Sequence, residues 1–588
     1  VMAVDHLSNI LQKLSQFAEA EACCRRILVT QPNYAPAYLM LGNIIEELGQ
    51  LNEAEIYCRQ ALEIKPDYAP AYLTLGYILQ KLGRLKEAEA CYRNVLEIKP
   101  DYAEAYNNLG NTLKELSRFS EAENCFRHAL EIKPSYTEAH SNLGSVFKEL
   151  CLFDEAEACY RKSLQLQPDF DAAFSNLLFV LNYHPDKTAQ EIFEAYQEYD
   201  AQFCLPHRNE WQPHNNNPTV HRRLKVGYVS ADFRKHAAQY FLEPLLAQHD
   251  KQAVEVYAYA ELAVEDSVTA RYKNYADHWI PTRGMSNDAL AQRIRADGID
   301  ILVDLAGHTA KNRLSVFARK PAPVSVSWLG YGYTTGLTAI DYFLTDITTV
   351  PQDSEILFSE TPYRVETPSF SYHPAEGMGE VNDLPALTNG HITFGTLTRT
   401  VRLNHRTITA WSEILKRVPD SRLVIDCKAF SDQYLQNLFA EKFVAHGIAR
   451  ERLSFGYHTP PWDVLRSIDI GLDCFPHNSG TTLFETLYMG VPYITLAGRP
   501  SVGRLGSCIL QGLGRPKWIA DNEADYIAKA VELASNTNHL SEIRAGLRDQ
   551  MENSPLRDEK NFAVKVETAY REIWKKWCQK NHHMDDKS

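Results

Sequence analysis

The segment 472–492, which reads LDCFPHNSGTTLFETLYMGVP, combines residue types that suit the binding of a phosphate group. An apolar run ends at Asp473, a polar loop follows, and a helix is expected to begin near Thr481 and Thr482. The unpaired N–H groups of a first helical turn, the helix dipole and two hydroxyls together favour an anion. The spacing has a second interpretation, because Thr482 and Glu485 also form the pattern of a helix-capping box. Glu485 is therefore expected either to cap the helix or to bind the hydroxyls of a ribose.

Three further polar loops follow predicted strands. His236 comes shortly after the first apolar strand, in KVGYVSADFRKH, where an imidazole is suited to acid–base chemistry. The alternative is a structural histidine, which is the commoner role of a single His. His308 lies in a second loop, DLAGHTAKNRL, and residues 330–336 form a third loop rich in Gly and Thr. Loops that converge on one edge of a sheet indicate a binding site, although none of them alone identifies a substrate.

Parallel β/α units are needed to hold such loops, and the sequence predicts two sets of them. The expected strands of the first set are 224–230, 254–260, 301–305, 324–329 and 340–345. After a segment with Gly and Pro, 371–390, the second set follows at 392–395, 422–426, 452–456, 468–472 and 493–497, and the chain closes with a helix at 561–578. Two consecutive α/β lobes place a ligand in the cleft between them, at the carboxyl ends of the strands.

The N-terminal part of the chain repeats every 34 residues. The units end at Pro32, Pro66, Pro100, Pro134 and Pro168. Each unit predicts two amphipathic helices that pack closely through Ala and Gly, and a turn in which Pro ends the second helix. Residues 171–204 keep the helical period without the repeat signature, as capping helices would, and 205–223 is a polar linker. The pattern resembles the tetratricopeptide repeat, which implies a solenoid with a concave binding face.

Asparagines occupy the sixth position of three successive units, at Asn108, Asn142 and Asn176. The equivalent residues of the earlier units are His6, Met40 and Thr74. Amide side chains both donate and accept hydrogen bonds, so this row suits the backbone of an extended acceptor peptide. Solvated asparagines on a helix surface are the alternative. Because the row is confined to the units closest to the predicted lobes, we expect it to bind an acceptor.

Composition excludes several classes of function. A net charge of −14 argues against binding to nucleic acid or to acidic membranes. There is no run of 18 apolar residues and no N-terminal signal pattern. Seven of the 12 cysteines fall in the repeat helices, where free Cys packs as a small hydrophobe, and no CxxC pair has metal-ligand spacing. We expect a cytoplasmic protein. The first residue falls in the middle of a repeat, which leaves room for further repeats before it.

Together with the repeats, five motifs resemble one family over nearly the whole chain: GYVSADFRKH, GHTAKNRL, RKPAPVSVSWLGY, TTGLTAIDY and SGTTLFETLYMGVP. It comprises the nucleotide-sugar protein O-glycosyltransferases with tetratricopeptide repeats, namely the protein O-GlcNAc transferases and the SPINDLY-type O-fucosyltransferases. The resemblance implies a repeat solenoid (1–204) followed by a GT-B region of two Rossmann-like lobes, at 224–375 and 385–578. It also implies inverting transfer to Ser or Thr without a metal or another cofactor.

The resemblance assigns roles by position. His236 matches an active-site histidine, and Arg402 stands where the family usually has a lysine that contacts the donor phosphates. Arginine keeps the charge but binds phosphate through a planar fork. The expected donor-binding residues are His308, Leu329, Gly330, Tyr331, Arg399, His458, Gly480, Thr481, Thr482 and Glu485. Of these, 329–331 match the loop around the sugar, Thr481 and Thr482 match the diphosphate site, and Glu485 matches a residue that holds the ribose.

The identity of the donor has two alternatives. Several motifs are closer to the SPINDLY-type branch, which implies GDP-fucose, whereas UDP-GlcNAc is the commoner donor of the family and is favoured here. Two departures bear on this point: Gly480 replaces a histidine common in GlcNAc enzymes, and Pro461 replaces a histidine near the base, a role that His458 is expected to take. An inactive scaffold, or a transferase acting on glycans or small molecules, is less favoured. The Gly, Thr and acidic residues of the donor loop are present, which argues against an inactive scaffold. The repeat groove suits an extended peptide, which argues against glycans or small molecules as acceptors.

Overall fold

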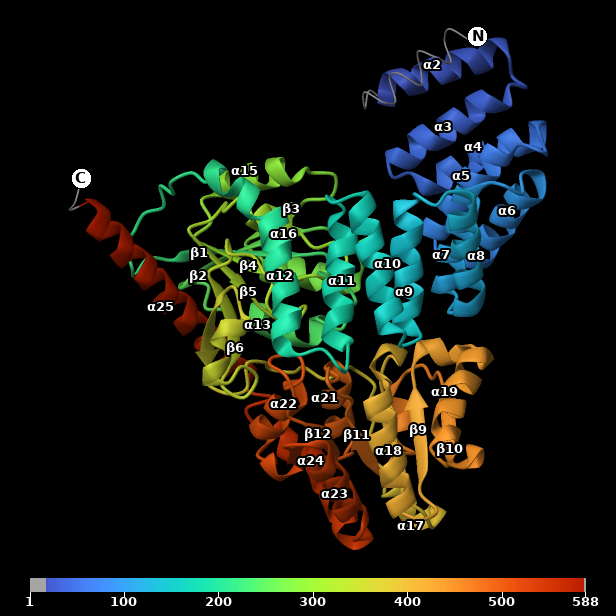
Figure 1. Ribbon diagram of the computed structural model, residues 1–588. Coiled ribbons are helices and arrows are strands. Elements are labelled where there is room, and N and C mark those ends of the chain that lie inside the picture. Colours follow the sequence, from blue (N-terminus) through green and yellow to red (C-terminus); the bar gives the residue numbers. More distant parts are fainter. Residues whose placement is uncertain (1–16, 586–588) are drawn as a thin grey trace. The chain divides into compact units, whose positions relative to one another are not determined.

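The computed structural model describes residues 17–585, with the side chains described up to residue 580. His6, the first residue of the predicted sixth-position series, lies outside the described residues. The chain divides after Pro168 into two compact units, 1–168 and 169–588. Figure 1 shows a helical first unit and a second unit that contains strands.

The first unit consists of antiparallel helix pairs, as the repeat period predicts. Its helices are α2 (Phe17–Thr30), α3 (Ala35–Glu47), α4 (Leu51–Ile64), α5 (Ala69–Lys81), α6 (Leu85–Ile98), α7 (Ala103–Glu115), α8 (Phe119–Ile132), α9 (Thr137–Glu149) and α10 (Phe153–Leu166). The regular spacing of the glycines in the repeats follows from helix packing. A Cβ atom at Gly76 would approach the ring of Tyr92 to 2.7 Å, and one at Gly110 would approach the ring of Phe126 equally closely. Only glycine lets these helix pairs come so near to each other.

The next two helices, α11 (Asp171–Tyr183) and α12 (Ala189–Phe203), belong to the second unit. This corrects the expected domain 1–204, in which they cap the repeats. Leu178 stands where four repeat units have glycine, so the close helix pairing of the repeats cannot continue. Their side chains instead contact the first lobe: the carboxylate of Asp200 accepts a hydrogen bond from the backbone N–H of Thr338 at 2.8 Å.

The first lobe contains a sheet of seven parallel strands in the order β3-β2-β1-β4-β5-β6-β7. The strands are β1 (Leu224–Ser230), β2 (Val254–Ala260), β3 (His278–Pro281), β4 (Ile301–Asp304), β5 (Val324–Ser327), β6 (Tyr342–Asp346) and β7 (Thr361–Val365). The helices are α13 (Gln239–Gln248), α14 (Ser267–Tyr275), α15 (Asn287–Asp297) and α16 (Leu314–Phe317). The five predicted strands are confirmed. The two missed strands, β3 and β7, lie at the edges, where a strand needs less apolar sequence.

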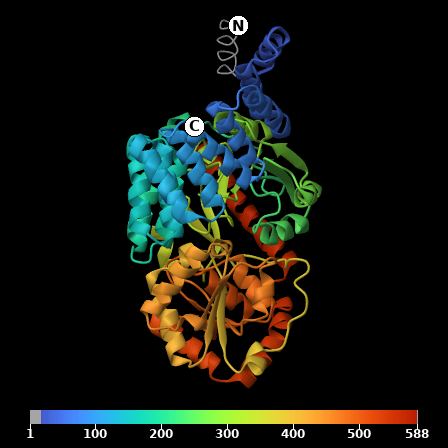
Figure 2. The same cartoon turned by 90° about the vertical axis from the view of Figure 1, so that its right-hand side faces the viewer.

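The second lobe contains six parallel strands in the order β10-β9-β8-β11-β12-β13. They are β8 (Thr393–Leu397), β9 (Arg422–Asp426), β10 (Leu453–Gly456), β11 (Ile470–Leu472), β12 (Tyr493–Leu496) and β13 (Ile519–Ala520). Figure 2 shows helices on both sides of these strands. They include α17 (Pro385–Asn389), α18 (His405–Arg417), α19 (Gln433–Ala445), α20 (Trp462–Leu465), α21 (Thr481–Tyr488), α22 (Leu505–Leu513), α23 (Glu523–Ala534) and α24 (Thr537–Glu552).

The closing helix, α25 (Glu559–Asp585), returns to the first lobe. Phe562, Val566 and Trp574 are buried in the same core as the strands of the first sheet, and Figure 1 draws α25 beside that sheet. Glu567 also accepts a hydrogen bond from the ring of buried His249, over 2.8 Å. The expected inclusion of this helix in a second lobe 385–578 is therefore corrected: its apolar face is complementary to the first sheet.

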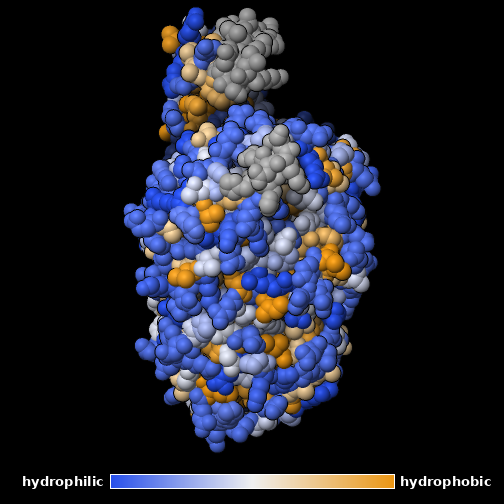
Figure 3. All heavy atoms as spheres, turned by 90° about the vertical axis from the view of Figure 1, so that its left-hand side faces the viewer, coloured by the Kyte–Doolittle hydropathy of each residue, from blue (hydrophilic) through white to orange (hydrophobic). Residues whose placement is uncertain are grey.

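The surface drawn in Figure 3 is mostly hydrophilic, with apolar side chains in small separate groups. Among the residues that the structure describes, no helix has the length and apolar character needed to cross a bilayer.

Candidate functional site

The predicted loops gather at the carboxyl ends of central strands. In the first lobe they follow β1, β4 and β5, and in the second they follow β8 and β11. The strand order reverses direction between β1 and β4 and again between β8 and β11. Ligands of parallel α/β sheets bind at such switch points, where neighbouring loops separate and leave a crevice.

Helix α21 begins at Thr481 without a side-chain cap. Its N-cap residue is Gly480, and within the described part of the chain no side chain accepts a hydrogen bond from the first turn. Thr482 lies inside the helix, so the capping box considered for Thr482 and Glu485 does not form. A Cβ atom added to Gly480 would meet no atom within 4 Å, which leaves the helix start open. The N–H group of Leu483 donates to the carbonyl of Gly480 at 2.9 Å, whereas those of Thr481 and Thr482 are available to an anion.

The loop before α21 is fixed by a buried carboxylate. Asp473 accepts hydrogen bonds from the backbone N–H of Cys474 and Ser479, both at 2.9 Å, and from the Thr495 hydroxyl at 2.7 Å. Burial raises the pKa of Asp473 to about 7, against the opposing effects of these hydrogen bonds and of nearby Arg402. The bonds hold the loop in one conformation and so preset the position of the helix start.

Arg402 is a cation without an ion pair among the residues that the structure describes. Its Nε is buried and has no hydrogen-bond partner, and its guanidinium carbon lies 5.6 Å from the ring centroid of Tyr183. The neighbouring Asn404 joins this segment to the loop before α21, because its Nδ2 donates to the carbonyl of Phe475 at 2.7 Å. Arg402 is also close enough to lower the pKa values of Asp473 and His477. The positive charge of Arg402, which has no acidic partner among the described residues, thus lies beside the open start of α21.

Glu485 is buried in α21, and its carboxylate has no hydrogen-bond partner among the described residues. Burial raises the pKa of Glu485 to about 7. Burial raises the pKa values of Tyr240 in the first lobe and of Tyr372 in the segment between the lobes, and the negative charge of Glu485 raises both further. The carboxylate of Glu485 therefore lies near both tyrosines. An unsatisfied buried carboxylate is costly, and the hydroxyls of a ligand would satisfy it.

His236 is exposed in the loop between β1 and α13. Its Nδ1 accepts a hydrogen bond from the backbone N–H of Ala238 at 3.3 Å and lies 3.5 Å from a carboxylate oxygen of Asp232. Because Nδ1 is engaged on the protein side, Nε2 is the nitrogen left to meet a substrate. This geometry is compatible with the acceptor-side role expected for His236.

The loop expected around the sugar has a constrained backbone. Leu329 has φ +76°, and a Cβ atom at Gly330 would lie 1.9 Å from the carbonyl oxygen of Leu305, so only glycine fits there. The hydroxyl of Tyr331 points away to helix α11, where Asn182 donates to it at 2.9 Å. The loop therefore presents mainly backbone to a ligand.

The donor-binding role expected for His308 receives no support from its surroundings. The ring is buried, Nδ1 lies 3.1 Å from the Ser175 hydroxyl, and Nε2 lies 2.7 Å from the carbonyl of Thr335. Both nitrogens are thus engaged, and burial lowers the pKa of His308 to about 4. His308 holds α11 against the first lobe.

The remaining expected residues lie apart from this centre or remain without a tested role. The ring of His458 is half-exposed at the end of β10, where Nδ1 pairs with Asp426 at 2.5 Å. Arg399 is exposed just before Arg402. In the first unit, Asn142 donates to Asn107 of the preceding repeat at 2.9 Å, and Asn108 lies 3.4 Å from the amide nitrogen of Asn107. Asn176 lies on α11 in the second unit.

Sequence reasoning missed two residues at this centre, His477 and Tyr183. Their rings stack with centroids 4.3 Å apart and an interplanar angle of 8°. His477 lies inside the loop motif 472–492, where nothing in its spacing distinguishes it from an ordinary loop histidine. Tyr183 lies at the end of a helix that reads as a solenoid cap. The signal that pointed to α11 was the loss of the repeat glycine at Leu178.

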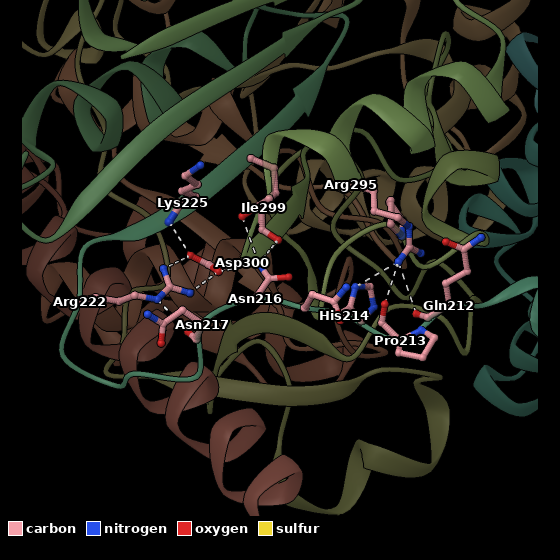
Figure 4. A pocket seen from close by; sticks show the side chains of 13 residues that line it. Gln212, Pro213, His214, Asn216, Asn217, Arg222, Lys225, Arg295, Ile299 and Asp300 are labelled. Atoms are coloured by element: carbon pink, nitrogen blue, oxygen red, sulfur yellow. Dashed lines mark hydrogen bonds and ion pairs between the residues drawn. The ribbon is translucent and has the colours of Figure 1, made fainter. Parts of the chain in front are cut away.

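A polar cavity of about 440 Å³ opens at the amino-terminal ends of central strands of the first sheet, next to the start of β1 and before β4. Figure 4 shows Arg222 and Asn216 around the buried carboxylate of Asp300, near the start of β4. These contacts fix the linker before β1, and the cavity is remote from the strand ends that carry the predicted loops. No cluster of three or more His, Cys, Asp or Glu side chains suited to a metal ion occurs among the residues described.

Comparison with known proteins agrees with this architecture. The model of the family described as "Glycosyl transferase family 41" matches residues 194–368 and 382–566, and tetratricopeptide-repeat models match 35–68, 67–135 and 137–170. A solved mutant of the Thermobaculum terrenum O-GlcNAc transferase superposes with a TM-score of 0.82 and 30% identity, covering 87% of this chain and 98% of that one.

Two curated relatives carry names of peptide N-acetylglucosaminyltransferases. The Arabidopsis thaliana protein named "Probable UDP-N-acetylglucosamine--peptide N-acetylglucosaminyltransferase SPINDLY" is 34% identical over 410 residues, covering 68% of this chain and 45% of its own length. The Caenorhabditis elegans protein named "UDP-N-acetylglucosamine--peptide N-acetylglucosaminyltransferase" is 25% identical over 477 residues, covering 60% of this chain and 41% of its own length. The match thus spans less than half of either relative.

Proposed function

Because the chain belongs to glycosyl transferase family 41, we propose that it transfers a sugar from a nucleotide sugar to Ser or Thr hydroxyls of acceptor proteins. UDP-GlcNAc is the favoured donor, since the relatives and the similar solved structure are named as GlcNAc transferases. The acceptor is proposed to be an extended peptide held in the groove of the repeats. The cysteines form no disulfide among the described residues, which fits the reducing cytoplasm proposed for the protein.

The observation that carries this proposal is the unpaired Arg402 guanidinium beside the uncapped start of α21. Transfer with inversion requires the acceptor oxygen to attack the anomeric carbon while the bond from that carbon to the diphosphate oxygen breaks. Negative charge then develops on the diphosphate, which Arg402 and the first-turn N–H groups of Thr481 and Thr482 would stabilise without a metal. His236 would orient the attacking hydroxyl by donating a hydrogen bond from Nε2, because Nδ1 accepts from Ala238 and the ring proton is therefore on Nε2. The proton of the attacking hydroxyl would pass to the oxygen of the leaving diphosphate.

A SPINDLY-type protein O-fucosyltransferase that uses GDP-fucose is the second candidate. It is favoured by Gly480, which leaves the helix start without the imidazole common in the GlcNAc enzymes. The open space around Gly480 accommodates a sugar with an N-acetyl group as well as one without it, so it does not distinguish the two donors. A scaffold that has lost activity is the third candidate.

Calorimetric titration with UDP and GDP, in parallel, separates these candidates. Binding of UDP alone, followed by GlcNAc transfer to Ser- and Thr-rich peptides in mass spectrometry, is the expected result. Binding of GDP alone, with fucose transfer, would identify GDP-fucose as the donor and leave the proposed mechanism unchanged. Binding of neither nucleotide would favour the scaffold. Arg402→Ala serves as the site control and is expected to weaken binding of whichever nucleotide the parental protein takes.

A further inference from the structure

The last turn of α11 is held by both lobes. Asn182 of this turn donates through Nδ2 to the hydroxyl of Tyr331, which belongs to the first lobe, at 2.9 Å. From the second lobe, half-buried Arg499 donates to the carbonyl oxygens of Asn182 and His184, each at 3.0 Å. The carbonyl groups at a helix C-terminus carry partial negative charge, so the guanidinium stabilises this helix end. The turn is therefore fixed relative to the loops of both sheets.

Tyr183, which lies in this turn, contacts His477 and Arg402 of the proposed diphosphate site. Its side chain is buried, with the ring stacked on His477 at 4.3 Å. The guanidinium carbon of Arg402 lies over the same ring, 5.6 Å from its centroid. A guanidinium over an aromatic face is attracted by the ring quadrupole, most strongly where water is excluded. Arg402 Nε has no hydrogen-bond partner among the described residues, so we expect the contact with this ring to orient the guanidinium.

The stacked His477 ring supports Tyr183 without competing for the anion. Its Nδ1 lies 2.9 Å from the carbonyl oxygen of Asn478, so Nδ1 carries the proton and donates it. Burial, and next the charge of Arg402, lower the pKa of His477 well below its ordinary value. The imidazole is therefore neutral at physiological pH. It adds a flat surface behind Tyr183 and leaves the charge of Arg402 available.

We propose that Tyr183 is a positioning residue of the donor site: backed by His477, its ring holds the Arg402 guanidinium at the place where the nucleotide diphosphate binds. The last turn of α11 thereby becomes part of the donor site, although it precedes both catalytic lobes in the chain. This inference rests on the proposed nucleotide-sugar transfer. A guanidinium already held in place loses less conformational freedom when the diphosphate binds, which strengthens binding.

The test is a double-mutant cycle on nucleotide binding, measured by calorimetry with UDP and GDP. Tyr183→Leu keeps apolar volume but removes the aromatic face, and it should weaken binding roughly tenfold. Tyr183→Phe keeps the face and should bind as the parental protein does. In an Arg402→Gln background, Tyr183→Leu should cause no further loss, because Tyr183 acts through Arg402.

Phe203→Leu is the matched control, since this aromatic residue of α12 packs on Phe174 and Tyr199 and is expected to leave binding unchanged. Parental affinity in Tyr183→Leu, or an equal loss in the Arg402→Gln background, would overturn the positioning role. A loss in Tyr183→Phe equal to that in Tyr183→Leu would overturn it as well. If the parental protein binds neither UDP nor GDP, the proposed function itself fails, which is a separate outcome of the same titration.

Discussion

Replacement of Glu485 by Gln should stabilise the unliganded protein at pH 8 but not at pH 5. The pKa of this carboxyl rises from 4.5 to about 7, because burial penalises the charged form. A carboxyl whose folded-state pKa is raised contributes its full stability below the unfolded pKa and loses it as pH rises through the folded pKa. The rise of about 2.5 pH units corresponds to about 3 kcal/mol at 1.36 kcal/mol per unit. For a unit of this size, that is a difference in Tm of roughly 3 °C.

The assay is thermal unfolding of the parental protein and of Glu485→Gln at both pH values. Asp473, whose pKa is also raised to about 7, titrates in both proteins and cancels from the difference. Glu532→Gln, at an exposed position of α23, should show no change with pH. A Tm difference between Glu485→Gln and the parental protein that is the same at pH 5 and pH 8 would refute the assigned burial cost.

The same substitution should weaken nucleotide binding at pH 8 by roughly tenfold, since hydrogen bonds from ribose hydroxyls are stronger to a carboxylate than to an amide; unchanged affinity would remove Glu485 from the donor site. Arg402→Ala should lower sugar transfer about a hundredfold, through a loss of roughly 3 kcal/mol of charge stabilisation, and Arg402→Lys should retain part of it. Parental turnover in Arg402→Ala would mean that the diphosphate site is misassigned. Replacement of Asn108, Asn142 and Asn176 by Ala should slow transfer to protein acceptors and leave donor hydrolysis nearly unchanged; equal loss of both rates would point to a structural role, such as the bond from Asn142 to Asn107. His308→Leu should lower stability by about 1–3 kcal/mol, because Ser175 and Thr335 lose a buried partner, while nucleotide affinity stays within twofold.

Local patterns in the sequence were enough to place most strands of both sheets. The predicted strand 254–260 coincides with β2 and 422–426 coincides with β9, because buried parallel strands are short apolar runs between polar loops. The same patterns located the start of α21, which the structure places at Thr481. They could not choose between the capping box and an open helix start, since that depends on whether the chain enters the helix at Gly480 or at Thr482.

The misplaced elements share one physical cause. Helices α11 and α25 each have an apolar face whose partner is distant in the sequence: Tyr183 stacks on His477, and Trp574 is buried with strands of the first sheet. An amphipathic period shows that one face of a helix is buried but not which surface buries it. Assignment by adjacency in the chain therefore gave α11 to the repeats and α25 to the second lobe. The consequence extends to the proposed function, because the helix assigned to the solenoid supplies the aromatic ring that lies under Arg402, the cation of the proposed donor site.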